Sequence, residues 1–207
     1  MPRILDLFCG PGGAAMGYHR AGFEVVGVDI RPQPHYPFEF HQADAMTYPL
    51  DGFDAVHASP PCQAYTQSAL TWRNRGKEYP RLIGPTRDRL MQIQVPWIIE
   101  NVPGAPVRAD YILCGCRVGL ALRRRRYFET SWEGWEMVGP CVHLEPVVSV
   151  VGHGAPSWVR EQLGYNPTIA QYRAAMGIDW MNRNELSEAI PPAYTEWIGG
   201  HLLRQFR

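Results

Sequence analysis

The sequence predicts an α/β fold in which a mixed, mostly parallel sheet is flanked by helices. Residues 3–30 read in order as an apolar strand, a glycine-rich loop, a helix and a second strand ending in an acid. Two later apolar runs, residues 53–57 and 96–102, are each soon followed by proline. Because proline cannot continue a β ladder, the chain leaves the sheet at both points. Open α/β sheets bind ligands at the carboxyl ends of their strands, so a site is expected there.

Length and composition indicate one globular domain with a small appendage. The chain has 207 residues, of which 45% are hydrophobic and 19% charged. No apolar run approaches the length of a membrane span, and no charged-then-apolar leader opens the chain, so we expect a cytoplasmic protein without a membrane partner. The five cysteines are scattered and odd in number, which favours reduced thiols over a disulfide framework.

Basic residues concentrate in the middle of the chain. Residues 64–126 contain twelve Arg or Lys against four Asp or Glu, so the segment carries a charge of +8 in a chain whose net charge is zero. This asymmetry indicates either one face that binds phosphates or a solvated surface on which charges are segregated by chance. The zero net charge argues against a general polyanion binder.

The glycine-rich loop, residues 9–13 (CGPGG), predicts a nucleoside site. Glycines allow close approach of a ligand, and the following helix offers unpaired N–H groups. Asp29, at the end of the second strand, suits ribose hydroxyls. The spacing is not G-x-G-x-x-G and no Walker lysine is present, so a ligand other than NAD or ATP is favoured. Asp44, near a third short strand, either accepts from an adenine amino group or caps a turn.

Two reactive side chains lie close to the two chain breaks. Cys62 is either a nucleophile at a strand end or a small buried core residue. Glu100 is either a buried acid with a raised pKa or a cap for the following loop. Because both lie at carboxyl ends of strands, a common site is favoured.

The second half of the chain is predicted in less detail. We expect a helix at residues 81–94 and a strand entered at residues 123–128, on which alternation would place Arg124 and Arg126 on one face. Residues 129–166 read as an irregular insert. Two further helices are expected, one capped by Thr168 and ended by Gly177 and one at residues 193–203.

Four residues have side chains that can bind a metal. Cys114-x-Cys116 and Cys141-x-His143 are either two ligand pairs of a structural zinc ion or ordinary thiols and a surface histidine. Zinc knuckles more often have two residues between their cysteines, so the sequence alone favours no metal.

Together these motifs resemble the C5-cytosine DNA methyltransferase family, in the family's order along most of the chain. The cofactor loop is matched by DLFCGPGG at residues 6–13, the nucleophile motif by SPPCQ at 59–63 and the second catalytic motif by ENV at 100–102. The paired-arginine motif and the C-terminal motifs are matched by Arg124-x-Arg126, by Thr168 with Gly177, and by AIPP at 189–192 with Ile198-Gly199.

The resemblance implies a Rossmann-like, S-adenosylmethionine-dependent methyltransferase fold and a set of site residues. The catalytic residues that it implies are Cys62, Glu100, Arg124 and Arg126. The cofactor-binding residues that it implies are Phe8, Gly10, Gly12, Gly13, Asp29, Ile30, Asp44, Ala45 and Pro60. Position and charge in the loop that follows Cys62 point to contact with nucleic acid by Gln63, Tyr65, Arg73, Arg75 and Lys77. The two arginines are expected to favour the thiolate of Cys62.

Several positions depart from the family's pattern. Leu122 and Glu188 stand where the family usually has Gln and Asn, and Gln171 stands for a usual Glu. The segment that would read the target sequence is short, as in phage-encoded members. We therefore expect a catalytic and cofactor-binding core at residues 1–128, a reduced target-recognition insert at 129–166 and C-terminal helices completing the core at 167–207.

The expected activity is methyl transfer from S-adenosylmethionine to C5 of cytosine in DNA, on a flipped or single-stranded base. We expect a monomer that acts in the cytoplasm of a bacterial or phage-infected cell. The short insert leaves three alternatives open: RNA or a free nucleotide as substrate, a modified methyl donor, or a non-catalytic relative that only binds nucleic acid.

Overall fold

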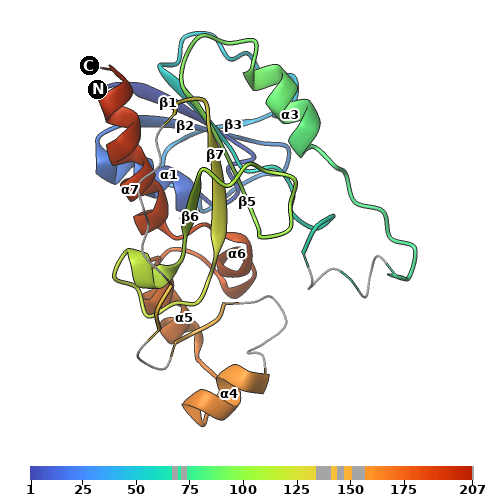
Figure 1. Ribbon diagram of the computed structural model, residues 1–207, viewed down its shortest axis with the longest axis vertical. Coiled ribbons are helices and arrows are strands. Elements are labelled where there is room, and N and C mark those ends of the chain that lie inside the picture. The colour runs from blue at the N-terminus through green and yellow to red at the C-terminus, as the bar shows by residue number, and fades with distance from the viewer. Residues whose placement is uncertain (67–69, 71–73, 134–140, 144–146, 151–156, 207) are drawn as a thin grey trace.

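A computed structural model describes residues 1–66, 70, 74–133, 141–143, 147–150 and 157–206. Seven strands form one sheet (Figure 1). The strands are β1 (Arg3–Leu7), β2 (Glu24–Asp29), β3 (Glu39–Gln42), β4 (Ala55–Ala58), β5 (Trp97–Asn101), β6 (Tyr111–Leu113) and β7 (Arg126–Thr130).

The order of the strands is β3-β2-β1-β4-β5-β7-β6. The first five are parallel, whereas β7 runs antiparallel to both β5 and β6. The sheet is therefore mixed and mostly parallel, as predicted. The order reverses between β1 and β4, which is where a doubly wound sheet opens a crevice for a ligand.

Helices cover both faces of the sheet (Figure 1). Helices α1 (Gly13–Ala21) and α7 (Pro192–Leu202) lie against one face, and α3 (Ile83–Leu90) lies against the other. Side chains alternate along each strand, so Ile4 faces α1 and α7 while Leu5 faces α3. Burying each such side chain contributes about 1.5–3 kcal/mol.

Close packing of α1 on α7 brings the C-terminal helices to the glycine-rich loop. A Cβ on Gly13 would lie 2.3 Å from the Ile190 carbonyl oxygen, and one on Gly17 would lie 2.0 Å from Thr195 Oγ1. Thr195 Oγ1 also donates a hydrogen bond to the Ala14 carbonyl at 2.8 Å. Gly13 is therefore required for helix packing, whatever its role toward a ligand.

A third core lies around α5 (Ile169–Met176) and α6 (Arg183–Glu188). The prediction that Thr168 caps α5 is confirmed, because its side chain accepts from the Gln171 N–H and the Gln171 side chain accepts from the Thr168 N–H. Gln171 thus completes a capping box as Glu would. Gly177 ends α5 with a left-handed backbone, as predicted.

Several elements differ from the predictions. Helix α4 (Ser157–Leu163) lies in the insert expected to be irregular, and α6 was not predicted; both are short and bury one side chain each, so neither shows a clear apolar period. Strand β7 begins only at Arg126, because the preceding residues pair with the insert instead. Arg123 donates its N–H to the Val148 carbonyl, and Val148 donates to that of Ala121.

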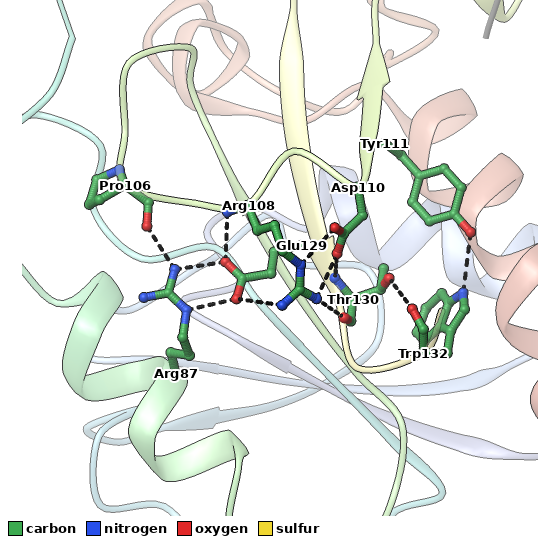
Figure 2. A network of polar contacts seen from close by, with 8 residues as sticks. All are labelled: Arg87, Pro106, Arg108, Asp110, Tyr111, Glu129, Thr130 and Trp132. Atoms are coloured by element: carbon green, nitrogen blue, oxygen red, sulfur yellow. Dashed lines mark hydrogen bonds and ion pairs between the residues drawn. The ribbon is translucent and has the colours of Figure 1, made fainter. Parts of the chain in front are cut away.

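Polar contacts join β7 to α3 and to the residues that precede β6 (Figure 2). The buried Glu129 carboxylate on β7 accepts two hydrogen bonds from the Arg87 guanidinium, both at 2.7 Å, and one from the Arg108 N–H at 2.9 Å. Arg108 is in turn paired with Asp110, whose carboxylate accepts from the Thr130 N–H. This network holds β7 in place beside β5.

Within the described part of the chain, no helix has both the length and the apolar composition needed to span a bilayer.

We predict that Glu129→Gln weakens the fold most at neutral pH. Burial alone would raise the pKa of Glu129, but the hydrogen bonds from Arg87 and the Arg108 N–H, with the charges of both arginines, hold it below its ordinary 4.5. The carboxylate therefore stabilises the fold above that value, and its contribution is lost as the pH falls through the lowered pKa. The variant should lose about 1–3 kcal/mol in urea unfolding at neutral pH, and less in acid.

The matched control is Glu133→Gln, an exposed acid on the same segment. A loss of stability that is equal at all pH values, or equal in the two variants, would contradict the role given to Glu129.

Candidate active site

A cavity of about 450 Å³ opens at the carboxyl edge of the parallel strands. Its walls come from the loop after β1, the end of β2, the segment after β4, the end of β5, the start of β7 and the link between α6 and α7. The expected site residues that line it are Phe8, Gly10, Asp29, Ile30, Pro60, Cys62, Gln63, Lys77, Glu100 and Arg126. The structure thus brings both strand-end side chains and the glycine-rich loop to one cavity.

The loop after β1 is shaped by backbone geometry and by Asp29. Phe8 and Gly10 both have positive φ angles, 57° and 49°, which turns the loop sharply at the end of the strand. The Asp29 carboxylate accepts from the Gly10 N–H at 3.1 Å and from the Arg31 N–H at 2.9 Å. A carboxylate has about four acceptor positions, so Asp29 retains capacity for ligand hydroxyls.

The Asn101 side chain joins the Cys62 segment to the Glu100 segment. Its Nδ2 donates to the Pro60 carbonyl at 2.8 Å, and its Oδ1 accepts from the Val102 N–H at 3.0 Å. Asn101 is buried, so these bonds are shielded from water. The two prolines and this amide fix where Cys62 stands relative to Glu100.

Glu100 is a buried acid facing Arg126. Its Oε1 lies 2.9 Å from Arg126 Nε, as an ion pair without hydrogen-bond geometry, so this oxygen has no hydrogen-bond partner among the described residues. Burial raises the pKa of Glu100, and the charges of Arg126, His57 and Arg124 only partly offset this. The carboxyl group is therefore more easily kept protonated than an ordinary glutamate.

The thiol of Cys62 is not activated in the free site. Burial raises its pKa above the ordinary 9.0, and the charge of Glu100 raises it further. The charges of Arg126 and Arg124 act in the expected direction but do not outweigh burial. The expectation that the two arginines favour the thiolate therefore needs this correction.

Arg124 and Arg126 have separate positions. Arg126 lines the cavity, whereas the guanidinium of the buried Arg124 donates to the Val150 and Ser187 carbonyls at 2.8 and 2.7 Å. Burial, followed by the charge of Arg126, lowers the pKa of Arg124 to about 9. Because Arg124 precedes β7, strand alternation does not position it, and its contacts tie the insert to the chain before α7.

Four expected cofactor residues do not line the cavity. The Asp44 carboxylate accepts from the Met46 N–H at 2.9 Å, which is the turn arrangement weighed as its alternative. The Ala45 side chain is buried in the core on the α3 face. Gly12 and Gly13 are packed against Pro37 and Ile190, where a Cβ would lie 2.7 and 2.3 Å from them.

The nucleic-acid residues fall into three groups. Gln63 and Lys77 line the cavity, and Lys77 Nζ lies 5.2 Å from the centre of the Tyr79 ring. Tyr65 instead packs against a small core that contains Ile83 and Val102. Arg75 is exposed outside the cavity lining, and Arg73 lies outside the described residues.

The basic segment does not form one open face. Among the described residues, at least five of its twelve cationic side chains make hydrogen bonds or ion pairs within the fold: Arg87, Arg89, Arg108, Arg124 and Arg126. The charge asymmetry in the sequence therefore overstates the surface that is open to phosphates, because much of it balances carboxylates and carbonyl groups within the fold.

A buried polar pair near Glu100 was not predicted from the sequence. Asp6 on β1 and His57 on β4 are paired in the sheet, and Oδ1 of the acid lies 2.8 Å from Nδ1 of the histidine, with both side chains fully buried. Their signal was a polar residue inside each apolar strand. Tyr79 and Glu188 also line the cavity, although the sequence identifies Glu188 only as a departure from the family pattern.

Solved structures of methyltransferases share this fold. A DNA modification methyltransferase encoded within an E. coli prophage has a TM-score of 0.65 at 14% identity, and the Entamoeba histolytica methyltransferase EhMeth has 0.66 at 14%. The S. pombe Dnmt2 methyltransferase has 0.66 at 13%. In each case the match covers 100% of this chain and 99% of the other. No protein-family model matches the chain, and no curated protein matches it. The chain therefore has an α/β, Rossmann-like methyltransferase fold.

We predict that Asn101→Ala loosens the Cys62 segment. Without the amide, the Pro60 carbonyl and the Val102 N–H lose their partners, which costs about 1–3 kcal/mol. The melting temperature should fall, and alkylation of Cys62 by iodoacetamide, followed by peptide mass spectrometry, should become faster. Asn184→Ala, at an exposed position of α6, is the control. An alkylation rate that Asn101→Ala leaves unchanged would contradict the positioning role.

We predict that alkylation of Cys62 keeps accelerating above pH 9.0, because burial raises the pKa of its thiol beyond that ordinary value. Glu100→Gln removes a negative charge next to the thiol and leaves Arg126 uncompensated, so the curve should shift to lower pH. Glu133→Gln is the distant control. A rate that levels off below pH 9.0 in the wild type, or a shift to higher pH in Glu100→Gln, would contradict this electrostatic account.

Proposed function

We propose that the chain transfers a methyl group from S-adenosylmethionine to C5 of cytosine in DNA, through a covalent bond between Cys62 and C6 of the base. The observation that carries the proposal is that Cys62, Glu100 and the glycine-rich loop with its partner Asp29 line one cavity. A nucleophile, an acid and a nucleoside cradle are the three parts that this reaction needs.

The residues present fit S-adenosylmethionine. The left-handed turn at Gly10 leaves open backbone next to the cavity, and Asp29 can accept from the ribose hydroxyls. Ile30 is 66% exposed although apolar, which suits stacking on an adenine face. When bound, the cofactor supplies an electrophilic methyl group. A volume of about 450 Å³ is ordinary for a ligand of this size.

Cytosine C5 is a poor nucleophile until the aromatic ring is broken. Addition of the Cys62 thiolate at C6 makes C5 enamine-like, and a proton held by Glu100 at N3 stabilises the adduct. The raised pKa of Glu100 keeps that proton available, and Arg126 stabilises the carboxylate after the proton leaves. After methyl transfer to C5, a base removes the C5 proton and the thiol is expelled.

The proposal requires the base to leave its stack. Flipping the base out of the duplex costs a few kcal/mol. Contacts of the protein with the DNA backbone and with the space that the base leaves in the stack must offset this cost. Gln63, which lines the cavity next to Cys62, would contact the vacated position. Lys77 and Arg75, with Arg73, would contact phosphates. Residues 129–166 would then serve as a reduced target-recognition insert between the core at 1–128 and the completing helices at 167–207.

The decisive experiment traps the covalent step. Incubating the chain with S-adenosylmethionine and DNA that contains 5-fluorocytosine in all sequence contexts should give an adduct stable to denaturation. After methyl transfer, C5 of this base carries no proton that a base could remove, and fluorine cannot leave as a cation, so the thiolate is not expelled. We expect the adduct with the wild type, none with Cys62→Ala and at least about a tenfold slower formation with Glu100→Gln. Glu133→Gln, at an exposed position outside the cavity lining, is the control.

The other outcomes separate the alternatives. An adduct only with 5-fluorocytosine RNA or nucleotide would replace DNA as the substrate while keeping the chemistry. No adduct with any of these, despite binding of S-adenosylmethionine, would reject catalysis and leave a nucleic-acid-binding relative.

A further inference from the structure

Three thiols and one imidazole meet where the chain connects β6 to β7, next to the Cys62 cavity but outside its lining. Cys114, Cys116, Cys141 and His143 place their ligand atoms within 4.8 Å of one another. Cys116 Sγ lies 3.3 Å from Cys141 Sγ, and His143 Nε2 lies 3.5 Å from Cys114 Sγ and 3.2 Å from Cys141 Sγ. The sequence alone is compatible with either a zinc site or ordinary thiols at these positions.

From this geometry we infer a structural Zn²⁺ site formed by Cys114, Cys116, Cys141 and His143. Zinc binds sulfur at about 2.3 Å and nitrogen at about 2.0 Å in a tetrahedron, so ligand atoms around one ion lie about 3.5–3.8 Å apart. The three measured separations are within about 0.5 Å of that spacing. The distance between the sulfur atoms of Cys116 and Cys141 is also too long for a disulfide, whose sulfur atoms lie about 2.05 Å apart.

The chain presents the four ligands through local structure at two places. Cys114 follows β6, and Cys116 lies in the short 3₁₀ turn Gly115–Arg117, so the turn brings two cysteines with one residue between them to the same side. Gly115 allows this turn, because a Cβ there would lie 2.3 Å from the Leu122 carbonyl oxygen. At the other place, Val142 is 51% exposed between Cys141 and His143, which are both partly buried on the opposite side.

The surrounding charge suits a zinc–thiolate centre. Three thiolates and one Zn²⁺ carry a net charge of −1. Arg117 and Arg125 line the same small cavity as Cys114 and Cys141, and both are positive. Four ligands from protein leave no open position, which is the pattern of a structural rather than a catalytic zinc.

The ion would close a loop that contains the active-site arginine. The loop runs from Cys116 through β7 to Cys141, and β7 begins at Arg126, the partner of Glu100. Zinc at its base would hold the insert against the hairpin, beside the bridge between Leu122 and Val148. This inference does not depend on the proposed methyl transfer, since the site lies outside the cavity of Cys62.

The test measures metal in the full chain. The protein is produced in zinc-supplemented medium, purified under reducing conditions without a metal-affinity tag and analysed by plasma mass spectrometry. We expect about one zinc ion per chain in the wild type and in the control Cys62→Ser, and less than about a tenth of that in Cys141→Ser. His143→Gln should reduce the content, whereas His41→Gln, at an exposed histidine, should not.

A second measurement needs no variant to fold. Replacing zinc by Co²⁺ in the wild type should give the visible absorption of tetrahedral cobalt with thiolate charge-transfer bands. Wild-type protein that holds less than about a tenth of an equivalent of either metal would overturn the inference. Two other results would also overturn it. One is a protein mass two hydrogens below the expected value with a disulfide mapped between Cys116 and Cys141, and the other is a Cys141→Ser variant that keeps its zinc.

Discussion

The burial of Glu100 is the constraint on which the site depends. An ionised carboxylate removed from water costs several kcal/mol unless a positive partner is held against it. Arg126 is that partner, and it stands in place only because β7 pairs antiparallel with β5. The contact between Arg126 Nε and Glu100 Oε1 does not have hydrogen-bond geometry. The ion pair therefore balances the charge of Glu100 but leaves Oε1 without a hydrogen bond among the described residues. A carboxyl group in this state can hold or release a proton with little structural change.

The remaining contacts can be understood as support for that pair. Arg87 and Glu129 hold β7 from the α3 face, and Arg124 ties the chain before β7 to the insert and to the segment before α7. Asn101 then places the Cys62 segment against the end of β5. Each contact joins residues that are at least 26 positions apart in the sequence, so the site depends on tertiary structure.

The sequence predicted the parallel part of the sheet well because each of its signals is local. An apolar run, a proline break and a glycine-rich turn each act within a few residues, and they located β1, α1, β2, β4 and β5 correctly. The same signals brought Cys62 and Glu100 to one edge of the sheet. The capping box at Thr168 is equally local.

The features of the site that could not be predicted from the sequence depend on contacts between residues far apart in the chain. Alternation suggested equal roles for Arg124 and Arg126, but pairing of Arg123 with Val148 removes Arg124 from the strand. The pairing of Asp6 with His57 needed the register of β1 on β4. Several arginines that the sequence suggested as a phosphate-binding face instead make contacts within the fold. The fold also brings together four metal-binding side chains from two separate segments.

The central claim is that Cys62 adds to C6 of cytosine while Glu100 holds a proton at N3. Addition at C6 makes C5 enamine-like, so a hydrogen at C5 should exchange with water even before methyl transfer. The most direct measurement is release of tritium from DNA that carries [5-³H]cytosine in all sequence contexts, with no methyl donor present. The account predicts release by the wild type, none by Cys62→Ala and slowed release by Glu100→Gln. Release that survives Cys62→Ala, or a wild type that releases none, would contradict it.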